Sequence, residues 1–163
     1  MANELPAGVD PQHALILETT PGTIVIKLHT DIAPGHAERM KMLAREQYYD
    51  DVPFHRVIDG FMAQTGDGEH GNGTGGSSYP DLKAEFSDKP FVRGTVGMAR
   101  SRNPNSANSQ FFIMFANGDF LNGQYTVIGE VVAGMDVVDK LKRGEPPSNP
   151  DRIISMQVAA DAK

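Results

Sequence analysis

Hydrophobic and polar residues alternate in two short segments near the start of the chain, HALILET at 13–19 and TIVIKL at 23–28. Because successive side chains of a β-strand point to opposite faces, this period of two is typical of a strand with one buried face. Pro21 and Gly22 lie between the two segments, and such a pair favours a tight turn. The pattern therefore predicts a β-hairpin.

A spacing of three and four residues then predicts an α-helix that begins at Pro34 and runs to about Gln47. The apolar positions of this helix are Ala33, Ala37, Met40, Leu43 and Ala44. Its other face, which we predict to be the polar one, carries His36, Glu38, Arg39, Lys41 and Arg45. A second helix with an apolar stripe is predicted from Met135 to Lys142.

The other apolar segments are short and are separated by turn-forming residues. They lie at 54–58, 62–65, 95–99, 111–115, 126–131 and 152–158. In FFIMF at 111–115, alternate residues are predicted to face the core and a different surface. The 17 glycines and 11 prolines also fit a turn-rich chain. Many short strands and only two helices predict a β-sandwich or barrel with helices over its open ends.

Length and charge restrict the classes of protein further. The 163 residues fit one domain, and we expect a flexible N-terminal tail at 1–12 and a single domain at 13–163. The net charge of −6 and the scattered cations argue against nucleic acid or an anionic membrane as a partner. No apolar run approaches the roughly 18 residues of a membrane span, and the acidic N-terminal residues do not resemble a secretory signal. We therefore expect a cytoplasmic protein.

Several kinds of reactive site are not supported by the sequence. The chain has no cysteine, which excludes disulfides, a thiol nucleophile and cysteine-based metal sites. The five histidines have no metal-ligand spacing, and no GxSxG occurs, so neither a metal site nor a serine nucleophile is predicted. GNGTGG at 71–76 lacks the Lys and Ser or Thr of a phosphate-binding loop, and we interpret it as a loop whose glycines supply positive φ.

Two segments combine large apolar residues with polar or cationic ones, FHRVIDGFMAQTGD at 54–67 and MARSRNPNSANSQFFIMF at 98–115. Both resemble the signature segments of the cyclophilin family of peptidyl-prolyl cis-trans isomerases. HGNGTGG and FLNGQYTVIGEVVAGMDVVDKL are similar to the loop and the C-terminal strand-helix unit of that family, in the expected order. The resemblance covers about residues 13–158 and is closest to the compact bacterial cytosolic members. It implies a closed antiparallel eight-stranded β-barrel capped by two α-helices.

Position by position, the resemblance implies a role for each matching residue. Arg56 matches the catalytic arginine, and Gln64 matches the residue that holds its guanidinium group. The pocket for the substrate proline ring matches Phe61, Met62, Phe112 and Leu121. Further groove positions match His55, Gln110, Phe120 and Tyr125, together with a strip for the substrate backbone at Ala99, Arg100 and Ser101.

Four positions depart from the family pattern. Many relatives have Asn at the position of Arg100 and Ala at that of Ser101, while eukaryotic relatives often have Trp at that of Phe120 and His at that of Tyr125. The last two departures change the rim of the pocket, so we predict weak cyclosporin binding.

The implied reaction, rotation about X-Pro bonds that assists protein folding, makes and cuts no bond and requires no cofactor. Taken singly, Arg56 and Gln64 also fit solvent-facing strand residues, and the apolar pocket residues also fit a core. Two hypotheses remain: a monomeric isomerase acting on unfolded or flexible protein segments, or a proline-peptide binding module with the same groove. The presence of both Arg56 and Gln64 favours the enzyme.

Overall fold

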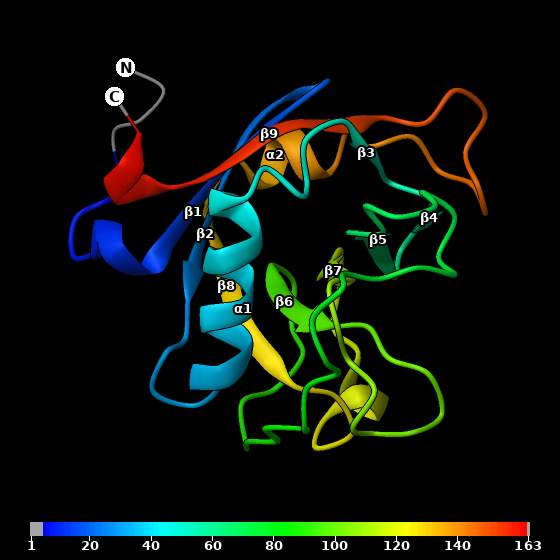
Figure 1. Ribbon diagram of the computed structural model, residues 1–163. Coiled ribbons are helices and arrows are strands. Elements are labelled where there is room, and N and C mark those ends of the chain that lie inside the picture. Colours follow the sequence, from blue (N-terminus) through cyan, green and yellow to red (C-terminus); the bar gives the residue numbers. More distant parts are fainter. Residues whose placement is uncertain (1–4, 163) are drawn as a thin grey trace.

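The structure, a computed structural model, describes residues 5–162 and is dominated by one curled antiparallel sheet (Figure 1). Its nine strands are hydrogen-bonded in the order β3-β9-β1-β2-β8-β6-β7-β5-β4. The strands are β1 (Ala14–Thr19), β2 (Gly22–Leu28), β3 (Val52–Pro53), β4 (Arg56–Ile58), β5 (Met62–Thr65), β6 (Thr95–Met98), β7 (Phe111–Met114), β8 (Val127–Ala133) and β9 (Arg152–Val158). The predicted hairpin is confirmed, because β1 and β2 pair from Ala14 with Lys27 to Thr19 with Gly22.

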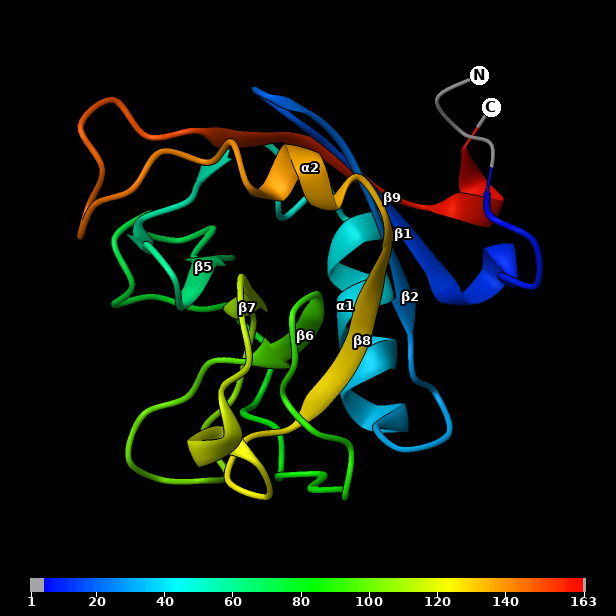
Figure 2. The same ribbon diagram turned by 180° about the vertical axis from the view of Figure 1, so that it is seen from behind.

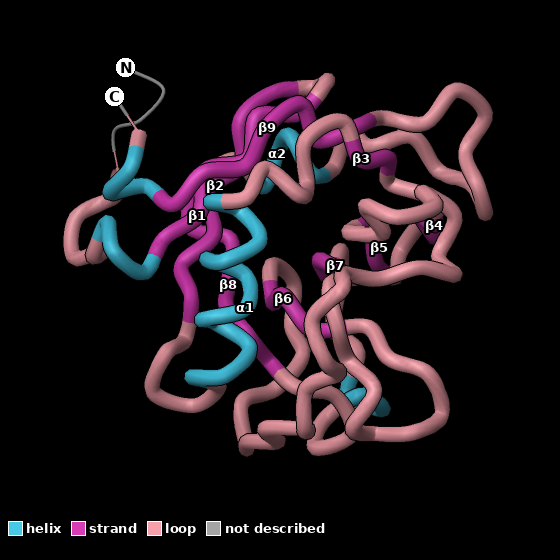
Figure 3. The backbone as a smooth tube through the Cα atoms, viewed as in Figure 1, coloured by secondary structure: helices cyan, strands magenta, loops and turns pink. Residues whose placement is uncertain are grey.

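Two α-helices accompany the sheet, α1 (Pro34–Arg45), which packs against β9, and α2 (Met135–Val138), which packs against β2 (Figure 2). Single 3-10 turns occur at Pro11–His13, Asp119–Leu121 and Ala159–Asp161. Loops and turns make up much of the chain around β5, β6 and β7 (Figure 3). Within residues 5–162, no helix has the length and apolar character needed to cross a membrane.

The predicted class, a mainly β protein with an antiparallel barrel-like sheet and two helices, is confirmed. The sheet has nine strands where eight were expected, because the two-residue strand β3 pairs with the start of β9. The described residues show no ladder between β3 and β4, the two ends of the strand order, so the barrel is partly open and not closed as the resemblance implied. Only Phe54 and His55 separate these strands, so the chain itself crosses the gap.

Both helices are shorter than predicted. Helix α1 ends at Arg45, and Gln47, its predicted last residue, has a φ of 61°, which the right-handed helix does not allow. Helix α2 ends at Val138, after which the N–H groups of Lys140 and Leu141 bond to carbonyls three residues back, as in a 3-10 turn. Of the tail predicted at 1–12, residues 1–4 lie outside the described residues, and the flexibility of the rest stays a prediction.

Two residues of the predicted polar face of α1 are buried, which corrects the prediction for that face. His36 is fully buried and Arg39 is 6% exposed, whereas Glu38 and Arg45 are exposed. The segment between β5 and β6 covers this face together with Asn108, which lies between β6 and β7. The guanidinium of Arg39 donates to the carbonyls of Pro80 and Asn108, at 2.6 and 3.2 Å, and Nδ1 of His36 lies 2.6 Å from Oε1 of Glu85. These contacts come from residues too distant in the sequence for a helical pattern to reveal.

Strand β7 separates two hydrophobic clusters, as its alternation predicted. Phe111, Ile113 and the following Phe115 belong to the main core between the sheet and α1. Phe112 and Met114 point to the other side, where they pack with a second cluster of Met62, Phe91, Leu121 and Val127. The sheet therefore carries its core on one face and a separate apolar surface on the other.

We expect Gly134→Ala to destabilise the protein much more than Gly123→Ala. Both glycines have a positive φ, 87° for Gly134 and 71° for Gly123. At a positive φ, a residue with a side chain has a conformational free energy about 1–2 kcal/mol less favourable. A Cβ atom at Gly134 would also overlap the carbonyl oxygen of Thr23, whereas one at Gly123 would meet nothing within 4 Å. Urea unfolding should show a loss of more than about 3 kcal/mol at residue 134 and about 1 kcal/mol at residue 123. Equal losses would contradict the close approach of Gly134 to β2.

Candidate active site

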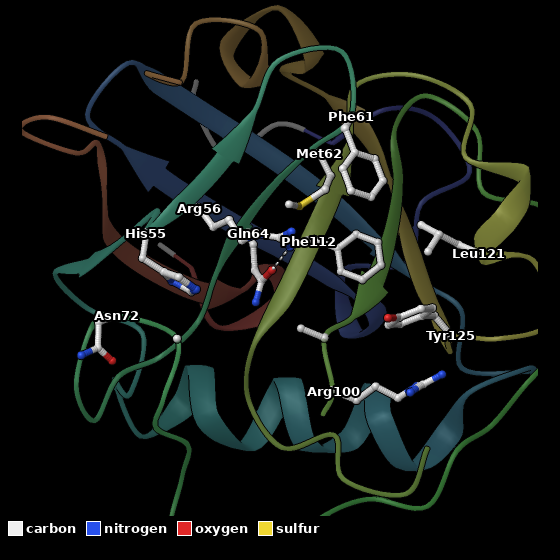
Figure 4. A pocket seen from close by; sticks show the side chains of 12 residues that line it. His55, Arg56, Phe61, Met62, Gln64, Asn72, Arg100, Phe112, Leu121 and Tyr125 are labelled. Carbon is white, nitrogen blue, oxygen red and sulfur yellow. Dashed lines mark hydrogen bonds between the residues drawn. The ribbon is translucent and has the colours of Figure 1, made fainter. Parts of the chain in front are cut away.

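A cavity of about 340 Å³ opens on the face of the sheet opposite the main core (Figure 4). Strands β4, β5 and β7 provide its floor, and the segments after β5, after β6 and before β8 provide its walls. The lining residues are His55, Arg56, Phe61, Met62, Gln64, Asn72, Gly73, Ala99, Arg100, Phe112, Leu121 and Tyr125. These residues come from segments that lie far apart in the sequence.

Ten of the thirteen predicted site residues line this cavity. Ser101 and Gln110 line an adjoining cavity instead, which shares Gln64, Gly73, Ala99 and Arg100 with the first. Phe120 lies outside both, 70% exposed, with its ring centroid 5.5 Å from that of Phe61. The structure therefore brings the predicted residues together in two joined cavities with an aromatic rim.

Asn72 and Gly73 also line the cavity, and the sequence analysis did not include them. They belong to the GNGTGG loop, whose sequence predicts only a loop with glycines at positive φ. The signal that could have identified them was the family resemblance of this loop. Its glycine pattern alone resembles that of many surface loops.

The apolar part of the cavity is firmly packed. Met62, Phe112 and Leu121 are at most 6% exposed. The ring of Phe112 stacks on Phe91 at 5.8 Å and meets Tyr125 edge-on at 5.9 Å. Aromatic contacts of this kind fix ring orientation, so the cavity floor is a preformed surface for a small apolar group.

Arg56 lies at the boundary between this apolar surface and solvent. It is the first residue of β4 and pairs directly with Gln64 on β5, so both side chains point to the same face. Nη1 of Arg56 donates to Oε1 of Gln64 at 3.3 Å, as the dashed line in Figure 4 shows. Nε of Arg56 donates to Oε1 of Glu145 at 3.3 Å. The guanidinium group is thus held at two of its three nitrogens.

Gln64 is itself fixed by a chain of amide hydrogen bonds. Its Nε2 donates to Oε1 of Gln110 at 3.0 Å. Nε2 of Gln110 in turn donates to the carbonyls of Gly73 and Gly75, at 3.0 and 2.9 Å. Because each amide nitrogen has a defined acceptor, the oxygen of Gln64 must face Arg56. The glycine-rich loop therefore contributes to the orientation of Arg56 through two glutamines.

The loop is held by the carboxylate of Asp67, which is 1% exposed. Its two oxygens accept hydrogen bonds of 2.8–3.2 Å from backbone N–H groups of residues 69, 70, 72, 73 and 75. Burial by itself raises the pKa of Asp67, but these backbone donors lower it to about 2, against a usual value of 3.8. The carboxylate is therefore ionised at neutral pH and organises the loop.

His55 forms another wall of the cavity and is 7% exposed. Burial lowers its pKa from the usual value of 6.5, although the carboxylate of Asp67 opposes this effect. Its buried Nδ1 has no hydrogen-bond partner among the described residues. With a lowered pKa, His55 is mainly neutral at pH 7.

Arg100 closes the cavity at the opposite end from His55. Its guanidinium carbon lies 4.3 Å from the centroid of the Tyr125 ring. Nη2 donates to the carbonyl of Gln124 at 2.6 Å, and Nη1 donates to that of Ser101 at 2.9 Å. These contacts tie the segment after β6 to the segment before β8. The site as a whole can hold a small apolar ring beside a guanidinium donor, with polar groups along one edge.

Comparison with known proteins identifies relatives along nearly the whole chain. Residues 14–158 match the family model described as "Cyclophilin type peptidyl-prolyl cis-trans isomerase/CLD". A Brucella suis protein named "Probable peptidyl-prolyl cis-trans isomerase" is 55% identical over 177 residues, covering 99% of this chain and 90% of that protein. A "Peptidyl-prolyl cis-trans isomerase" of Synechococcus elongatus is 38% identical over 149 residues, covering 90% of this chain and 97% of that protein.

Solved structures show the same similarity. The crystal structure of the cyclophilin AquaCyp293 from Hirschia baltica has a TM-score of 0.88 and 30% identity, covering 95% of this chain and 77% of that one. A Cryptosporidium parvum cyclophilin type peptidyl-prolyl cis-trans isomerase, crystallised in the presence of the dipeptide Ala-Pro, has a TM-score of 0.82 and 26% identity. That match covers 89% of this chain and 98% of the other.

We expect Asp67→Asn to destabilise the protein at pH 7 and to make its free energy of unfolding less dependent on pH between pH 7 and pH 3. Because the folded pKa lies below the unfolded one, ionised Asp67 stabilises the fold above pH 3.8, and this stabilisation is lost as the pH falls through about 2. The shift corresponds to about 2 kcal/mol at pH 7, of which roughly half is lost by pH 3.

Urea unfolding between pH 7 and pH 3 would measure this difference, with the exposed Asp88→Asn as the control. The gap between the native protein and Asp67→Asn should narrow as the pH falls. A gap that stays constant would show that ionisation of Asp67 does not hold the loop.

Proposed function

The chain belongs to the cyclophilin-type peptidyl-prolyl cis-trans isomerases, and we propose that the cavity beside Arg56 is where it binds proline and catalyses rotation of the preceding peptide bond. The observation that carries this proposal is the guanidinium of Arg56, held by Gln64 at the edge of a packed apolar surface. The roles given below to individual residues are part of the proposal.

The reaction has an unusual requirement, because no covalent bond is made or cut. Amide resonance opposes rotation with a barrier of about 18–20 kcal/mol, and uncatalysed X-Pro exchange takes tens to hundreds of seconds. At the top of the barrier the amide is twisted, and the prolyl nitrogen regains a localised lone pair. A donor that bonds to this nitrogen therefore binds the twisted state better than the planar one and accelerates rotation.

Arg56 can supply that donor. Its guanidinium is always charged and carries five N–H groups in one plane. Gln64 and Glu145 take bonds from Nη1 and Nε, and the hydrogen bonds of the described residues leave Nη2 unengaged. We assign Nη2 as the donor to the prolyl nitrogen. Such a donor is already oriented before substrate binds, so little reorganisation is required in the transition state.

The apolar surface holds the proline ring while the preceding carbonyl moves. It consists of Phe61, Met62, Phe112 and Leu121, which lie around the same end of the cavity in Figure 4. Anchoring only the ring leaves the other side of the bond free to rotate. The Cryptosporidium parvum relative crystallised with Ala-Pro supports a proline-containing ligand for this chain as well.

The polar edge is assigned to the substrate backbone. Ala99 and Arg100 follow β6 and border both cavities, whereas Ser101 and Gln110 line the second one. The side chain of Arg100 is occupied by backbone carbonyls and Tyr125, so substrate contacts here depend on backbone groups. This limits the consequence of having Arg where many relatives have Asn.

We further propose that the substrates are proline-containing segments of unfolded or flexible proteins, and that the protein acts as a monomer in the cytoplasm. An open cavity on one face of the sheet supports binding of an extended chain. The alternative, a binding module with little catalysis, would retain the apolar surface without needing an oriented arginine. The two hydrogen bonds that hold Arg56 favour catalysis.

We expect Arg56→Ala to fold normally and to lower kcat/KM about 100- to 1,000-fold, the cost of losing one preorganised transition-state donor. The side chain is 44% exposed, so its loss should leave the core unchanged. NMR exchange or a protease-coupled assay on a short X-Pro peptide would measure the effect. The control is Arg152→Ala, which removes an equally exposed strand arginine, 45%, outside the cavity. An unchanged rate in folded Arg56→Ala would contradict the assigned mechanism.

We expect weak cyclosporin binding by the native chain and tighter binding by Phe120→Trp. The family resemblance implies that an indole at this position contacts the drug through its N–H and its apolar face, and Phe120 has neither that donor nor the same area. Because Phe120 is 70% exposed on the rim, an indole fits there without disturbing the core. A hydrogen bond and the added apolar contact should tighten binding at least about tenfold.

Titration of both proteins with cyclosporin would test this expectation, with peptide turnover measured in parallel. Turnover should change little, because Phe120 does not line the cavity. Equally tight inhibition of both proteins would show that residue 120 does not govern the affinity.

A further inference from the structure

The sequence analysis assigns no structural element and no site residue to the segment RGEPPSNP, residues 143–150. It follows α2 and runs beside β3 and β4, as the orange part of the ribbon shows in both views (Figures 1 and 2). Val57 and Gly144 join the two segments by exchanging backbone hydrogen bonds, each of 2.8 Å. Glu145 directly follows Gly144, whose backbone is bonded to β4, and therefore lies beside Arg56.

Residues on either side of Glu145 also anchor this segment. Arg143 donates to Oδ1 of Asp59 at 3.0 Å and lies over the ring of Phe115 at 4.2 Å. The backbone N–H of Lys142 donates to Asp151 at 2.9 Å. The position of Glu145 is thus imposed by several contacts that do not involve its own side chain.

We propose that Glu145 is a positioning residue for Arg56, an inference that rests on the function proposed for that arginine. Oε1 of Glu145 accepts from Nε at 3.3 Å, and Oε1 of Gln64 accepts from Nη1 at 3.3 Å. Two acceptors on neighbouring nitrogens of one planar group fix its rotation as well as its position. Nη2, the remaining nitrogen, is then directed by both residues together.

The contribution of Glu145 is to orientation and not to stability. The side chains of Arg56 and Glu145 are 44% and 58% exposed, and ion pairs with this exposure add little to the free energy of unfolding. If Gln64 were the only acceptor, the guanidinium group could still rotate about the hydrogen bond between Nη1 and Oε1 of Gln64. Loss of Glu145 should therefore slow rotation of the bound X-Pro bond, while substrate binding and folding stay nearly unchanged.

The test compares Glu145→Ala and Glu145→Gln with the native enzyme on a short X-Pro peptide. Glu145→Ala should lower kcat about five- to tenfold, with KM within about twofold. Glu145→Gln keeps an acceptor oxygen and should retain most of kcat. In NMR spectra, the Nε–H signal of Arg56, assigned by its absence in Arg56→Ala, should shift and exchange faster in Glu145→Ala and stay near its native position in Glu145→Gln.

Asp161→Ala is the matched control, because Asp161 accepts from Nε of Arg45 at 2.9 Å with both side chains 44% exposed, away from the cavity. It should leave kcat and the Arg56 signal unchanged. If Arg56→Ala slows the reaction but Glu145→Ala changes neither kcat nor the Arg56 signal, the proposal for Glu145 is overturned and the function of Arg56 stands. If Glu145→Gln is as slow as Glu145→Ala, positioning through an acceptor oxygen is likewise overturned. If Arg56→Ala itself is fully active, the proposed function fails.

Discussion

Five backbone N–H groups of one loop converge on the buried carboxylate of Asp67, and the polar half of the cavity depends on this convergence. The ordered loop presents the carbonyls of Gly73 and Gly75 to Gln110, whose amide then fixes that of Gln64. Gln64 in turn holds Arg56. A single ionised carboxylate outside the cavity therefore fixes one of the two acceptors that orient the guanidinium group. If the hydrogen bonds to Asp67 are lost, the later hydrogen bonds of the chain lose their fixed partners as well.

The sheet allows this arrangement because its two faces carry different surfaces. On β7, Phe111 and Ile113 belong to the main core, while Phe112 faces the cavity. The rigid core thus lies directly behind the floor of the site. Rotation about a peptide bond requires a preformed surface more than a titrating group. The buried His55, whose pKa is lowered by burial, fits a site in which no proton is transferred.

Long segments without regular structure contribute as much to the site as the strands do. The segment between β5 and β6 supplies the cavity wall at Asn72 and Gly73 and also covers α1, where the carbonyl of Pro80 accepts a hydrogen bond from buried Arg39. The segment after α2 brings Glu145 to the other side of Arg56. Both are held by specific polar contacts together with a few buried apolar residues, such as Phe91 and Leu141. Their order therefore follows from hydrogen bonding as well as from hydrophobic packing.

Features that depend on neighbouring residues could be predicted from the sequence alone. Alternation predicted the hairpin of β1 and β2 and the two faces of β7, and Pro34 marked the start of α1, because period and backbone restriction are local properties. Family resemblance named most residues of the cavity. The burial of His36 and Arg39, the partly open barrel and the contact of Glu145 with Arg56 emerge only from the packing of distant segments. Glu145 and Arg56 are 89 positions apart in the sequence. A periodic pattern within one segment does not indicate which distant segment will cover its face.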